Sequence, residues 1–120
     1  MGYVRIYSDA DGDTHFEDVV PAQTQESYAA AEWQISAPLP VSDLRFRRVT
    51  KEYPPAAHVA PRRQLIVGLT GEVEIEVSDG EKRRFGPGSV LLVDDVTGKG
   101  HTTRRIGDTI RETLFVSLPD

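Results

Sequence analysis

Apolar and polar residues alternate along much of the chain, most clearly in Glu72–Val77. There Val73, Ile75 and Val77 point to one face and three glutamates point to the other. This period of two predicts a strand with one buried and one solvated face. Similar alternation, or a short apolar run bounded by turn residues, predicts strands at Tyr3–Tyr7, Thr14–Val20, Leu44–Thr50, Leu65–Leu69, Lys82–Phe85, Val90–Val93, His101–Ile106 and Arg111–Leu118.

Glycine- and aspartate-rich turns separate these segments. Ser78-Asp79-Gly80 favours a tight hairpin turn. Ser8–Asp13 resembles a calcium loop but lacks the distal glutamate, so we predict a solvated turn there. Tyr28–Gln34 has helical propensity, yet it is short and lies among predicted strands, so we favour a strand or an irregular segment. Many short strands without a convincing helix predict an all-β antiparallel sandwich or barrel.

Length and composition narrow the function classes. A chain of 120 residues is expected to form one domain with a real core. It has no cysteine, which excludes disulfides and thiolate chemistry, and its charge of −5 argues against a nucleic-acid partner. No apolar run is long enough to span a membrane, and the N-terminal stretch Met1–Asp13 lacks the basic and apolar regions of a secretory signal, so a cytoplasmic location is the expectation.

The stretch from Pro54 to Gly71 carries the candidate chemistry. It begins with two prolines, passes His58 and Gln64, and then enters the apolar run Leu65–Leu69. Polar groups at the junction between a loop and a buried strand are well placed to form a site, because the sheet fixes them and the loop leaves them reachable. His15, beside Phe16, is interpreted as a half-exposed strand residue.

Two motifs in the chain resemble those of the cupins. His58, Ala60, Gln64 and Gly71 fall on the first motif, in which a His, a second His, a Glu and a Gly stand at these positions. The resemblance covers about Val41–Leu118 and implies a double-stranded β-helix, a jelly-roll barrel with an internal pocket.

The second cupin motif begins with a glycine, continues through a buried strand and ends in a histidine. Here Gly88 precedes Val90–Val93, and Gly98-Lys99-Gly100-His101 supplies the ending. Residues 1–40 would then form N-terminal strands or an arm, and residues 41–118 the barrel core. The resemblance also implies a homodimer in which the N-terminal strands pack on the partner.

The chain departs from the family at the metal ligands. The family holds a metal with three histidines and a glutamate, but Ala60 and Gln64 replace one histidine and the glutamate. The set His58, Gln64 and His101 lacks an anionic ligand and is poor for a divalent ion. The leading hypothesis is therefore a small-molecule pocket with no required metal cofactor.

In this hypothesis His58 and His101 transfer protons in an isomerase, cyclase or lyase reaction, because histidine exchanges protons near neutral pH. No aspartate is evident in the sequence as a partner for either ring. Gln64, Arg62 and Trp33 are candidate ligand-binding residues. One alternative is a metal-dependent oxygenase or isomerase that uses His58, Gln64 and His101. Another is a ligand-binding protein that performs no chemistry.

Overall fold

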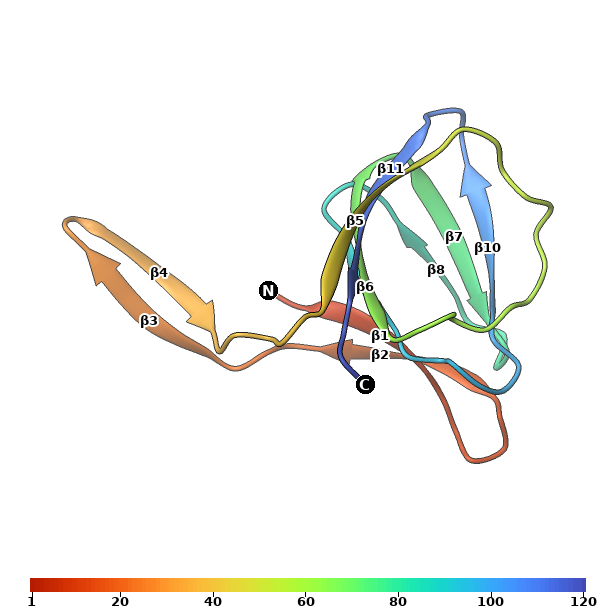
Figure 1. Ribbon diagram of the computed structural model, residues 1–120, viewed down its shortest axis with the longest axis horizontal. Helices are drawn as coiled ribbons and strands as arrows, with labels where there is room; N and C mark the ends of the chain where they lie inside the picture. Colours follow the sequence, from red (N-terminus) through yellow and green to blue (C-terminus); the bar gives the residue numbers. More distant parts are fainter.

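The computed structural model describes all 120 residues, which form eleven strands and no helix (Figure 1). The strands are β1 (Tyr3–Ser8), β2 (Thr14–Val19), β3 (Gln23–Tyr28), β4 (Ala31–Ser36), β5 (Asp43–Val49), β6 (Gln64–Thr70), β7 (Glu72–Val77), β8 (Lys82–Phe85), β9 (Val90–Val93), β10 (His101–Ile106) and β11 (Arg111–Ser117). The predicted all-β class is confirmed. With no helix, the structure has no helical segment that could cross a membrane.

The strands form two facing sheets and one separate hairpin. The larger sheet has the order β2-β1-β9-β6-β11-β5, the smaller has the order β10-β7-β8, and β3 pairs only with β4. The two larger sheets are not joined edge to edge, so the predicted barrel is an open sandwich. One pair departs from the predicted antiparallel arrangement, because β1 runs parallel to β9.

The core lies between the facing sheets and results from the alternation seen in the sequence. Val73, Ile75 and Val77 of β7 are buried, and Leu91 and Val93 of β9 belong to the same apolar cluster. The glutamates of β7 point away from this cluster. Removing apolar side chains from water at about 25 cal/mol per Å² is the main force that holds the two sheets together.

The opposite, outer face of the larger sheet is also apolar. Phe46 of β5 lies beside Leu114 of β11, which lies beside Val67 of β6, and Val67 lies beside Val90 of β9. A second row contains Leu44, Val116, Leu65 and Leu92. We call these eight side chains the outer apolar face. Phe46 is 85% exposed and Leu44 is 49% exposed, so part of this face is open to solvent.

The hairpin of β3 and β4, which we call the arm, projects away from the two sheets (Figure 1). The segment for which the sequence favours a strand or irregular structure is therefore the turn and second strand of this hairpin. Every residue of β4 is exposed, including Trp33 and Ile35. An isolated two-stranded hairpin is only marginally stable in water, so the arm lacks the support that the other strands have.

Candidate functional site

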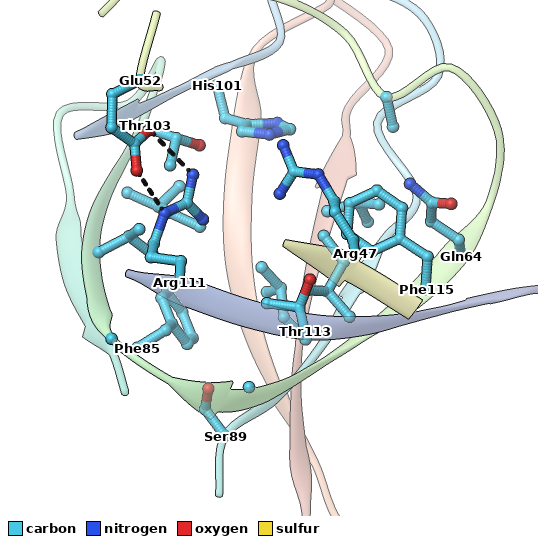
Figure 2. A pocket seen from close by; sticks show the side chains of 18 of the residues that line it. Arg47, Glu52, Gln64, Phe85, Ser89, His101, Thr103, Arg111, Thr113 and Phe115 are labelled. Atoms are coloured by element: carbon cyan, nitrogen blue, oxygen red, sulfur yellow. Dashed lines mark hydrogen bonds and ion pairs between the residues drawn. The ribbon is translucent and has the colours of Figure 1, made fainter. Parts of the chain in front are cut away.

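A cavity of about 510 Å³ opens between the two sheets (Figure 2). Its size falls in the range usual for small-molecule sites. Aliphatic side chains from the facing strands form much of its wall, and polar side chains converge on it from several strands and from the loop before β6. The polar residues that line it include Arg47, Glu52, His58, Gln64, His101, Arg111 and Thr113.

His58 and His101 meet at the edge of this cavity, although they are far apart in the sequence. Their main chains form an antiparallel bridge, with N–H to O distances of 3.0 and 2.9 Å, and their ring centroids are 4.8 Å apart. His58 is exposed at the opening, whereas His101 is only 6% exposed. The two rings are thus neighbours at one side of the opening.

Gly100 makes this close approach possible. Its φ of +74° lies in the left-handed region, and a Cβ at this position would collide with the carbonyl group of His58. The Thr14 hydroxyl donates a hydrogen bond of 2.7 Å to the Gly100 carbonyl oxygen. A glycine is therefore needed where the loop passes the His58 backbone and enters β10.

Asp95 is a functional candidate that the sequence does not reveal. Its Oδ2 lies 2.6 Å from Nδ1 of His101, and its side chain is fully buried. A carboxylate only accepts hydrogen bonds, so in the neutral ring Nδ1 carries the proton and Nε2 carries the lone pair. The structure therefore contains a His–Asp pair that the sequence does not reveal. The available signal was Asp94-Asp95 at the end of a buried strand, in the loop that leads to His101.

The loop that contains Asp95 is held in place by backbone hydrogen bonds. The Ala60 N–H donates to the Asp95 carbonyl oxygen at 3.0 Å, and the Asp94 N–H donates to the Ile6 carbonyl oxygen at 2.9 Å. The Asp94 carboxylate also accepts hydrogen bonds from Arg5 and Arg63. These contacts fix the loop on both sides of the Asp95 side chain.

Two buried polar atoms at the cavity have no hydrogen-bond partner within the protein. They are Oε1 of Gln64, a residue that is 2% exposed, and Oγ1 of Thr113, a residue that is 7% exposed. Buried polar groups are almost always satisfied, because leaving one unpaired costs about 1–3 kcal/mol. Both residues line the cavity, so a ligand bound there is a candidate partner for these atoms.

Two arginines line the cavity, and their electrostatic environments differ. Arg111 donates two hydrogen bonds to Glu52, at 2.8 and 3.1 Å (Figure 2). This pairing lowers the pKa of Glu52 below its ordinary value, chiefly through the hydrogen bond from Arg111. The Arg47 guanidinium instead lies over the Phe115 ring, 4.8 Å from its centroid.

Two residues singled out in the sequence lie outside the cavity. Arg62 is exposed on the loop before β6, and Trp33 is on the arm, 42% exposed. The Trp33 indole lies near Glu26 of the neighbouring strand, with an N–H to O distance of 3.4 Å. Among the five predicted site residues, the structure brings together His58, Gln64 and His101 and separates Arg62 and Trp33 from them.

His15 has a place of its own on the surface. Its Nε2 lies 2.7 Å from Asp9 of the β1–β2 turn, and its Nδ1 lies 2.8 Å from Asp79 of the β7–β8 turn. These carboxylates, Asp9 first, raise the pKa of His15 above its ordinary value. The predicted half-exposed strand histidine thus connects two turns, away from the cavity.

The residues at the cavity do not fit a divalent metal. His58 and His101 offer two imidazoles and Gln64 offers an amide, while the nearby Asp95 carboxylate is hydrogen-bonded to His101. No group of three or more histidine, aspartate or glutamate side chains is arranged to hold a metal ion anywhere in the structure. Stable zinc or iron sites need at least three well-placed ligands, usually with an anion among them.

No protein-family model matches the chain, and no curated protein matches it.

Proposed function

We propose that this protein is a cupin-like enzyme that binds a small organic molecule between its sheets and moves a proton with His101. One observation carries the proposal: His101 is nearly buried at the cavity, Asp95 holds its Nδ1, and its Nε2 makes no hydrogen bond within the protein. A carboxylate that orients an imidazole leaves the opposite nitrogen ready to act as a base.

This arrangement suggests a class of reaction. The Nε2 lone pair of His101 takes a proton from a carbon next to a carbonyl group, and the electron pair moves onto the carbonyl oxygen. Asp95 stabilises the resulting imidazolium. Return of the proton to another position gives an isomer or epimer, whereas departure of a group from the neighbouring carbon gives a lyase product. His58, whose ring is 4.8 Å from that of His101, would in its imidazolium form give a proton to the substrate and then regain one from the His101 imidazolium.

A probe that reports any positioned base tests the proposal without the natural substrate. Bases open 5-nitrobenzisoxazole by taking its ring C–H proton, which breaks the N–O bond and gives a coloured cyanophenolate. We expect the protein to open it faster than the same concentration of free imidazole, and His101→Gln to remove the excess rate. A wild-type rate equal to that of imidazole would favour a binding protein without chemistry, and an unaffected His101→Gln variant would exclude His101 as the base.

Elemental analysis of the untreated protein tests the metal-dependent alternative. Because the donor set is poor, we expect every transition metal to be far below one equivalent. A stoichiometric metal that is lost together with activity would replace the proposal by a metal-dependent reaction.

We also propose that the protein is a homodimer located in the cytoplasm. The support for the dimer is the outer apolar face, which crosses four strands, together with an arm that finds no support in its own chain. Contiguous exposed apolar surfaces are typical of protein interfaces. A second copy would cover the outer apolar face and give the arm a surface to pack on, in a closed two-fold arrangement.

A further inference from the structure

Among the arginine and carboxylate side chains that line the cavity, only Arg47 has no partner of opposite charge. Glu52 and Arg111 pair with each other, and His101 pairs with Asp95. Arg47 makes no ion pair. Among the neighbouring groups, the like charge of Arg111 has the largest influence and lowers the pKa of Arg47, while Glu52 and Tyr53 act in the opposite direction. Arg47 is therefore the one arginine at the cavity that makes no ion pair with a carboxylate of the protein.

The position of Arg47 is set by the sheet. It stands on β5 opposite Thr113 of β11, and both side chains line the cavity. Its guanidinium stacks on Phe115 and points toward the His101 side of the cavity (Figure 2). Stacking on an aromatic ring fixes the plane of the guanidinium and leaves its N–H groups free to donate.

Partial burial of the Arg47 charge between the two sheets is energetically unfavourable. Loss of solvent is the largest influence on Arg47 and lowers its pKa from the ordinary value, and Arg111 lowers it further. A partly buried arginine that makes no ion pair is unfavourable. An anionic ligand bound to Arg47 would offset both the loss of solvent and the repulsion by Arg111. Gln64 and Thr113, which carry unpartnered polar atoms, line the same cavity, and their amide and hydroxyl groups would bind uncharged polar groups of the same molecule.

We infer that the ligand of this cavity is a small carboxylic acid whose carboxylate is bound by Arg47. The role of Arg47 in catalysis rests on the proposed function, whereas the binding of a carboxylate by Arg47 does not. A carboxylate matches the two parallel N–H groups of a guanidinium. With the carboxylate held by Arg47, the adjacent carbon lies on the side of the cavity where His101 acts. Arg47 would also stabilise the negative charge that develops when His101 removes the proton.

Benzoate and benzamide are suitable probes, because they have the same shape and differ in charge. We expect benzoate to shift the backbone amide signals of His101 and Thr113 in an NMR titration, with the millimolar affinity usual for a fragment. Benzamide should bind much more weakly. Arg47→Gln should weaken benzoate binding about tenfold or more, since charged hydrogen bonds are lost. Arg47→Lys should recover only part of the affinity, because a lysine lacks the planar fork.

Arg48→Gln is the matched control, because it makes the same change one residue away on the exposed, opposite face of β5. It should bind benzoate as the wild type does, and dispersed spectra will show that each variant is folded. Absence of benzoate shifts, equal binding of benzamide, or undiminished binding by Arg47→Gln would each overturn the inference. His101→Gln separates the carboxylate-binding inference from the proposed proton transfer. Retained benzoate binding with a lost proton-transfer rate supports both. An unchanged rate excludes His101 as the base and leaves the binding of carboxylates by Arg47 standing.

Discussion

Replacing Asp95 by asparagine tests the central pair of the site with the smallest possible change. The substitution keeps the size of the side chain and removes its charge. Asp95 is fully buried and lies 2.6 Å from Nδ1 of His101, so no solvent is present to compensate for the loss. The amide of Asp95→Asn can also donate to Nδ1, which would place the ring proton on Nε2 and abolish the free lone pair.

The size of the effect depends on the charge that forms during the reaction. When His101 takes a proton, the centre of the imidazolium charge is about 4 Å from the centre of the Asp95 carboxylate charge. The attraction between these two charges is about 4 kcal/mol at an effective dielectric constant of about 20. Because about 1.4 kcal/mol corresponds to a factor of ten, we expect Asp95→Asn to slow proton transfer by about a thousandfold. The neutral ground state gains far less from the carboxylate, so the loss falls on the transition state.

Opening of 5-nitrobenzisoxazole measures the rate, and ¹⁵N signals of the His101 ring report its tautomer. We expect the Nδ1–H form in the wild type and a changed ratio in Asp95→Asn, which a purely structural role would not produce. Asp94→Asn is the control, since Asp94 contacts Arg5 and Arg63 instead of His101. Denaturant unfolding will show that both variants are folded. An Asp95→Asn variant that keeps the wild-type rate and tautomer would refute the reasoning.

Three further predictions concern other parts of the molecule. Gly100→Ala should lower the free energy of unfolding in urea by at least about 2 kcal/mol. The alanine would be strained at a left-handed φ, and its Cβ would collide with the His58 carbonyl group. An unchanged urea midpoint would contradict this prediction. His15→Gln should cost stability mainly between about pH 3.8 and 6.5. The raised pKa of His15 makes the stabilisation from its ion pairs fully present below the ordinary value of 6.5, and this stabilisation is lost as the pH rises through the folded-state value. The lowered pKa values of Asp9 and Asp79 make the contribution of the carboxylates fully present above the ordinary value of 3.8, and it is lost as the pH falls through their folded-state values. A difference from wild type that grows at alkaline pH would have the wrong sign. Phe46→Asp should convert a dimer to a monomer in light scattering, whereas Tyr53→Asp, at an equally exposed position, should not; a wild-type monomer would remove the dimer.

Most of the strands could be predicted because their signal is local. The alternation in Glu72–Val77 sets β7, and turn residues mark its ends, so neither depends on distant contacts. The arm is different, because Tyr28–Gln34 has helical propensity and no alternation that identifies a buried face. The two strands of the arm form only because they pair with each other, in a register that places Glu26 opposite Trp33. The parallel pairing of β1 with β9 likewise depends on chain topology, which no local pattern encodes.

Part of the site could be predicted for a similar reason. His58 and Gln64 stand at the boundary of a recognisable buried strand, and His101 follows a glycine-rich loop. Asp95 and Arg47 were missed because their roles depend on direction. Asp95 looks like one of two loop carboxylates, yet one points outward to arginines and the other inward to His101. Arg47 looks like any strand arginine until the register places it opposite Thr113, facing the cavity.

The loop between β9 and β10 connects the fold to the chemistry. It begins where Asp94 is held by Arg5 and Arg63, and it ends where Gly100 passes the His58 carbonyl group. Between these fixed points the Asp95 side chain turns into the core, where its only hydrogen-bond partner is His101. A buried carboxylate contributes little to stability, because removing it from water offsets most of what the pairing gains. Its burial is therefore better explained by the orientation that it gives to His101 than by any need of the fold.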